Sequence, residues 1–94
     1  MMNSVIARKL LKVELEDLRI RTYRFFAQSV NKTTHKEIVG PDGLPYQIEF
    51  EVFWDNRRGG NIRVQGSVDD GRLRAVIPLT DSFIIAPDGT FPDE

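Results

Sequence analysis

The sequence has no cysteine and a single histidine, His35. Without cysteine it can form neither a disulfide framework nor a thiolate metal site or nucleophile. A catalytic triad would need His35 to meet a serine and an aspartate across the fold, and we expect it instead on an exposed strand face near Glu49. Glu49 and Glu51 share that face with Arg63, which would keep both ionised. We therefore predict a protein that is not an enzyme, with no catalytic residue, metal site or cofactor.

Long apolar runs are also missing. No segment approaches the roughly 20 apolar residues that span a bilayer, and residues 1 to 12 lack the uninterrupted apolar core of a secretory signal. We expect a cytoplasmic protein with no membrane partner. The 94 residues are 40% hydrophobic and 29% charged, which is ordinary globular composition and predicts a single domain over residues 1–94.

Charge is unevenly divided along the chain, although the net charge is only -1. Residues 1–40 carry eight Lys or Arg against four Asp or Glu, and residues 41–94 carry five against ten. Either the two halves neutralise each other within one fold, or the first half forms a basic face for nucleic acid.

Residues 4 to about 30 show the apolar period of one α-helix, capped by Asn3 or Ser4. A hairpin centred on Glu16 and Asp17 is disfavoured because a two-residue hairpin turn requires positive φ, which these residues rarely adopt. The residues that form the helical stripe predicted to face the core are Leu11, Leu15, Leu18, Thr22, Phe25 and Ser29.

The same helix carries a second apolar stripe, formed by Ile6, Leu10, Val13 and Ile20. A helix packed on one sheet needs only one apolar face. Either the C-terminal tail, with residues 83–85 and Phe91, folds over this stripe, or another protomer covers it. We favour the intermolecular role.

Beyond residue 31 the apolar period changes to two. Residues 33–40 lead through a Pro-Asp-Gly turn to an alternating strand, residues 46–54, and residues 61–68 alternate again. The residues of these strands predicted to face the core are Ile38, Tyr46, Ile48, Phe50, Val52, Trp54, Ile62, Val64, Gly66 and Val68.

Asp70 and Gly71 are typical of a two-residue hairpin turn. With this turn, the inward residues of the two strands lie opposite each other on the same face of the sheet. The pairs are Val68–Leu73, Gly66–Ala75, Val64–Ile77 and Ile62–Leu79. Residues 81–86 add a short fifth strand. Because glycine leaves a gap in a strand, we expect an aromatic ring of Phe25, Phe26 or Phe50 over Gly66, with a β-bulge as the rival interpretation.

Residues 55–60 connect two strands, and Gly59 and Gly60 suit a tight turn. Arg57 and Arg58 are not required by the turn and could meet a phosphate or a carboxylate. We favour a plain turn, with protein contact ahead of nucleic acid among the functional alternatives.

The tail of residues 78–91, P-L-T-D-S-F-I-I-A-P-D-G-T-F, together with residues 46–55, resembles a type of short bacterial protein of unassigned function. The resemblance covers about the last half of the chain and implies a bacterial cytoplasmic origin. It implies no activity, because the matching motifs consist of turn and strand residues.

These patterns predict a two-layer α+β domain, with an N-terminal helix on one face of a four- or five-stranded antiparallel meander. We predict a protein-interaction module whose expected partner is a second copy of itself. It would use the second helix stripe, Phe53 on the outer sheet face, Arg57 and Arg58. The alternative is nucleic-acid binding through Arg57, Arg58 and the basic helix flank, with Tyr23 as a stacking group. The overall acidity, with a pI near 5.8, counts against it. That flank comprises Arg8, Lys9, Lys12 and Arg19.

Overall fold

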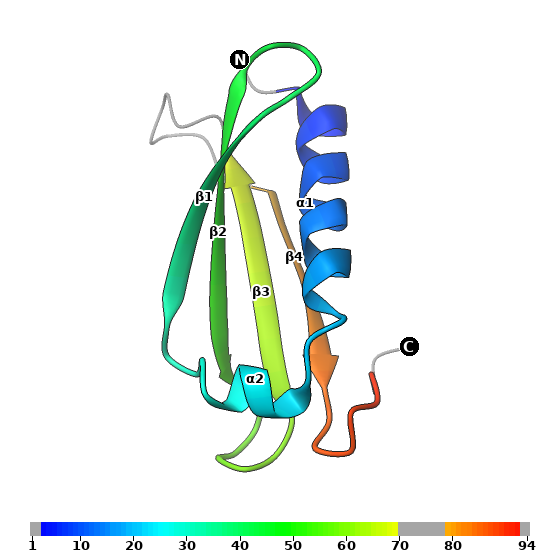
Figure 1. Ribbon diagram of the computed structural model, residues 1–94, viewed down its shortest axis with the longest axis vertical. Coiled ribbons are helices and arrows are strands. Elements are labelled where there is room, and N and C mark those ends of the chain that lie inside the picture. The colour runs from blue at the N-terminus through cyan, green and yellow to red at the C-terminus, as the bar shows by residue number, and fades with distance from the viewer. Residues whose placement is uncertain (1–2, 70–78, 93–94) are drawn as a thin grey trace.

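The computed structural model describes residues 3–69 and 79–92. Four antiparallel strands form one sheet in the order β1-β2-β3-β4, and α1 lies across one face of it (Figure 1). This arrangement confirms the predicted two-layer α+β fold. The elements are α1 (Ser4–Leu18), α2 (Tyr23–Ala27), β1 (Thr33–Val39), β2 (Pro45–Trp54), β3 (Ile62–Asp69) and β4 (Leu79–Ile85).

The helical region is divided in two, so the single helix predicted to about residue 30 is wrong. Asn3 caps α1 because its side-chain oxygen accepts hydrogen bonds from the amides of Val5 and Ile6. Thr22 has an extended backbone, and its hydroxyl accepts a hydrogen bond from the amide of Phe25, which starts α2.

The break also changes which aromatic residue is buried. Ala7, Leu11 and Leu15 of α1 lie in the core as one stripe. After the new start at Thr22, Phe26 is buried and the predicted Phe25 is 39% exposed.

The β1–β2 hairpin forms as predicted. Gly43 takes a positive φ of 80° in the Pro-Asp-Gly turn, a conformation that glycine adopts without steric cost. Tyr46 pairs with Ile38, and the inward residues of β2 are buried except Trp54, which is half-buried. Asp42 accepts a hydrogen bond from the Tyr46 hydroxyl at 2.7 Å, which fixes the turn to the strand that follows it.

The predicted register of the last hairpin is wrong. β4 pairs with β3 so that Ile62 faces Ile85 and Val64 faces Phe83, rather than Leu79 and Ile77. The partner of Val68 is Leu79, six positions beyond the predicted Leu73. An even shift keeps every side chain on its face, so facial alternation could not distinguish the two registers. The Asp70-Gly71 turn, Leu73, Ala75 and Ile77 lie outside the described residues.

Gly66 marks where α1 meets the sheet. A Cβ atom at this position would lie 2.7 Å from Leu11 Cδ1 and 3.1 Å from Phe50 Cε1. The predicted contact with Phe50 is confirmed, whereas the helix approaches through Leu11 and not through its aromatic end. Gly66 faces Asp81, not Ala75, and both ladders run through it without a bulge.

Candidate binding surface along the basic flank of α1

The second helix stripe does not form one exposed surface. Ile6 and Leu10 are half-buried against the core, whereas Val13 and Ile20 are 55% and 83% exposed. Residues 83–85 belong to β4, on which α1 packs, and Phe91 packs edge-on against Phe83. Homodimerisation stays a prediction, with less exposed apolar helix surface than the sequence suggested.

Phe53 is half-buried on the outer sheet face, opposite Arg63. Arg63 donates hydrogen bonds to Asp55 at 3.1 Å and to Ser82 at 2.9 Å. The expected pairing of Arg63 with Glu49 and Glu51 is therefore wrong, since those residues lie opposite Ser67 and Gln65 in the ladder. His35 is exposed and lies 3.5 Å from Glu49, as predicted.

Arg57 and Arg58 are exposed in the turn between β2 and β3. Gly59 has a φ of 82° there, which confirms a turn built on glycine. The Tyr23 hydroxyl donates a hydrogen bond to the carbonyl of Gly60 at 2.7 Å. Tyr23, expected as a stacking group for bases, therefore anchors α2 to this turn.

The two flanks of α1 differ in charge. On the side toward β1, Glu14 accepts a hydrogen bond from Lys36 at 2.8 Å, which raises the pKa of Lys36. On the side toward β4, positions 8, 12 and 19 are four and seven residues apart and so form one line of cations. We use the name basic flank for all cations that line the hollows described next, including Lys9 on α1 and Arg21 and Arg24 beyond its end: Arg8, Lys9, Lys12, Arg19, Arg21 and Arg24.

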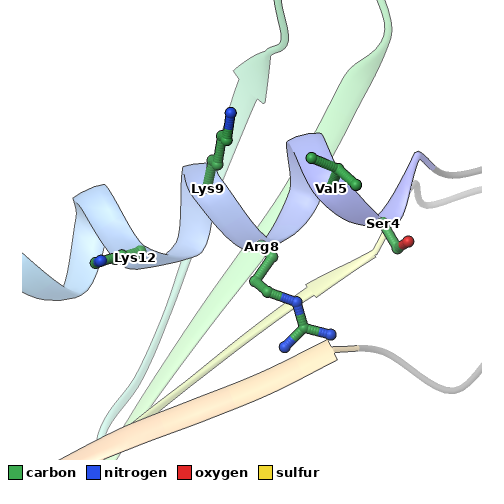
Figure 2. A pocket seen from close by; sticks show the side chains of 5 residues that line it. All are labelled: Ser4, Val5, Arg8, Lys9 and Lys12. Carbon is green, nitrogen blue, oxygen red and sulfur yellow. The ribbon is translucent and has the colours of Figure 1, made fainter.

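Three adjoining hollows follow the basic flank. The first, of about 240 Å³, is lined by Arg8, Lys9 and Lys12, and Figure 2 shows Arg8 directed toward the pale orange strand β4. In the same view Lys9 points to the other side of the helix. The second, of about 320 Å³, lies between α1 and β4, where it shares Arg8 and Lys12 with the first.

The third hollow, of about 450 Å³, lies where α1 and α2 meet the C-terminal segment, and it shares Arg19 with the second. The Arg19 guanidinium stacks on the Phe91 ring, 4.3 Å from its centroid. Arg21 and Arg24 also line this hollow. Sequence reasoning missed both, although recognition of Thr22 as a helix cap could have placed them at the α1–α2 junction.

Three carboxylates line the same hollows: Glu16, Asp81 and Asp88. Two of them accept hydrogen bonds from residues close in sequence. Asp81 accepts one from the amide of Ser82, and Asp88 accepts from both the amide and the hydroxyl of Thr90. The Thr90 hydroxyl holds the pKa of Asp88 below its ordinary value. Six cations against three carboxylates leave this surface basic.

A different hollow lies on the opposite side of α1. It has a volume of about 100 Å³ between α2 and the inner faces of β1 and β2, and its lining includes Leu18, Phe25 and Phe50. Its walls are mainly apolar, with Lys32 as the single charged residue among them.

No protein-family model, curated protein or solved structure matches the chain. Within residues 3–69 and 79–92, no helix combines the length and apolar character needed to cross a membrane. The resemblance to short bacterial proteins and the cytoplasmic location stay predictions. Function is inferred below from the geometry of the basic flank.

Proposed function

We propose that the protein is a non-enzymatic interaction module that binds an acidic protein partner along the basic flank. The observation that supports this proposal is a series of three adjoining hollows lined by six cationic side chains. The first lies on α1, the second between α1 and β4, and the third where α1 and α2 meet the C-terminal segment. Arginine and lysine at such a surface form charge-assisted hydrogen bonds with carboxylates and steer an acidic partner during encounter.

The contrast with the other flank of α1 favours an external partner. Lys36 is matched by Glu14 within the fold, whereas the hollow beside β4 holds three cations against two carboxylates, Glu16 and Asp81, and Asp81 hydrogen-bonds the amide of Ser82. Among the described residues the cations that line these hollows outnumber the carboxylates, and such a surface attracts an acidic partner.

Nucleic acid is the competing ligand for the same cations. The net charge of -1 opposes it, because affinity for nucleic acid depends on neutralising many phosphates. The hydroxyl of Tyr23 is bound to Gly60, and Arg57 and Arg58 belong to a separate turn. These features favour a protein partner.

A fluorescence-anisotropy titration with a labelled glutamate-rich peptide at low and high salt tests the proposal. We expect the double variant Arg8→Glu/Lys12→Glu to weaken binding by about tenfold or more, because it reverses two charges in the hollows. The matched control is Arg57→Glu/Arg58→Glu, which makes the same charge change in the exposed turn and should alter the affinity by less than about twofold.

Equal losses in the two double variants would show that net charge, and not the basic flank, determines binding. Absence of salt-sensitive peptide binding, or tighter binding of single-stranded or duplex nucleic acid, would contradict the proposed function. Circular dichroism of both variants checks that the fold is intact.

A further inference from the structure

β4 forms one edge of the sheet, directly beside the basic flank. The amide of Asp55 donates to the carbonyl of Asn61, so odd-numbered residues of β3 direct their main-chain groups toward β2. Even-numbered residues of β3 therefore face β4 and bond to its odd-numbered partners.

The main-chain groups of Thr80, Ser82 and Ile84 consequently point away from β3, to the side on which no strand of residues 3–69 and 79–92 pairs with β4. The hydrogen bonding of Ser82 agrees, because its amide donates to the side chain of Asp81 at 2.8 Å. An edge of this kind can accept one more strand through main-chain hydrogen bonds.

A strand added beside β4 would send alternate side chains toward the α1 face. There they would enter the second hollow, where Arg8 and Lys12 project from α1. These two cations are four residues apart, hence about 6 Å along the helix axis. Residues two apart on a strand are about 6.8 Å apart, so carboxylates at alternate positions match the cations.

We propose that the acidic partner docks as an additional β-strand along β4, with alternate carboxylates opposite Arg8 and Lys12. The inference rests on the proposed function and specifies its mode of recognition. The ligand is an extended segment in which acidic residues alternate with residues that face the outer side of the sheet.

A second copy of this chain fits the edge less well. Two β4 strands paired antiparallel, about a two-fold axis perpendicular to the sheet, would place both α1 helices on the same face of the joined sheet. Their basic flanks would then face each other, with Arg8, Lys12 and Arg19 of each copy in mutual repulsion. An acidic segment of another protein has the complementary charge.

Asp81 opposes the docking. It faces Gly66 on the α1 side of the sheet, so its carboxylate lies in the path of the acidic side chains, and it also occupies the amide of Ser82. A charge on the inner face of an edge strand is a known protection against unspecific strand addition. Asp81→Asn removes the charge and should tighten binding of an acidic strand severalfold.

The decisive experiment uses three forms of one peptide in which glutamate and valine alternate along the sequence. One is unmodified, one is N-methylated at its glutamates and one at its valines. Only one set of amides can face β4, because main-chain groups alternate along a strand. We expect one methylated peptide to lose about tenfold or more in affinity and the other to bind like the parent.

The outcomes separate the two proposals. If both methylated peptides bind like the parent while binding remains sensitive to salt and to Arg8→Glu/Lys12→Glu, strand addition is wrong and the proposed function stands. If the parent peptide shows no such binding, both fail. A β4-mediated dimer in sedimentation equilibrium that the peptide does not dissociate would also overturn the inference.

Discussion

The two edges of the sheet are built differently. Along β1 every residue except Ile38 is exposed, and the Lys36–Glu14 ion pair links the strand to α1. Along β4, residues 83–85 are buried, and α1 packs over this strand and β3. The helix thus lies to one side of the sheet, so one edge belongs to the core and the other extends beyond it (Figure 1).

The difference extends to the surfaces beside each edge. The hollow near β1 and β2 has apolar walls, whereas the hollows near β4 are lined by the basic flank. Only Leu18 of α1 borders the apolar hollow, which is otherwise formed by residues 25–34 and by β2, whereas α1 itself supplies most of the basic lining beside β4.

The largest effect of this asymmetry is expected on stability, in a comparison of Phe83→Ala with Ile38→Ala. Phe83 is buried between the rings of Phe26 and Phe91, and its loss should reduce the free energy of unfolding by about 3–5 kcal/mol. Ile38 is half-buried at the β1 edge, and its loss should cost about 1 kcal/mol. Urea unfolding measures both, and similar costs would contradict an off-centre core.

A smaller effect is expected at the contact between α1 and β3. Gly66→Val should cost about 1–3 kcal/mol, because its side chain would overlap the buried Leu11 and the ring of Phe50. The same denaturation measurement applies. Ser67→Val, on the outer face of the same strand, is the control and should be nearly neutral.

Leu11→Ala supplies a second check on this contact. In that background the cost of Gly66→Val should fall, since the nearest clashing atom is gone. Additive costs would show that Leu11 does not limit the space above Gly66.

The smallest effect concerns the two Pro-Asp-Gly turns. The Tyr46 hydroxyl holds the pKa of Asp42 below its ordinary value, so Tyr46→Phe should raise it. A depressed carboxyl pKa stabilises the fold above the unfolded pKa of about 3.9 and loses that effect as pH falls through the folded pKa. The stability difference between the variant and the parent should therefore shrink in acid.

Carboxyl-carbon NMR titration measures the pKa of Asp42 directly. Asp88 in the second turn is an internal control, because its pKa is lowered by Thr90 and should not respond to Tyr46→Phe. An unchanged Asp42 would show that the hydrogen bond from Tyr46 has no electrostatic effect in solution.

Local patterns predicted most of the fold. Alternation identified β1, β2 and β3, and glycine chemistry identified the turns at Gly43 and Gly59. The prediction of the β3–β4 register failed because a shift by an even number of residues leaves every side chain on the same face of the sheet. The prediction of one continuous helix failed because Thr22 was assigned to the core-facing stripe by its spacing, whereas its hydroxyl caps a new helix.

The candidate surface was predictable only in part. The line of Arg8, Lys12 and Arg19 follows from helical spacing alone. Its position beside β4 depends on contacts between the first and last elements of the fold, which no periodicity encodes. The same limit applies to Tyr23, whose hydroxyl meets Gly60 through a contact 37 residues apart in sequence.

The packing of α1 against β4 has a consequence for synthesis. The apolar stripe of α1 is complete at Leu15, but translation reaches Leu79 only after roughly 3 to 13 seconds, at about 5–20 residues per second. During that interval the nascent helix exposes Ala7, Leu11 and Leu15 without the strand on which it finally rests. A chaperone that recognises short apolar helices therefore has its opportunity early in translation, before the protein can close its own core.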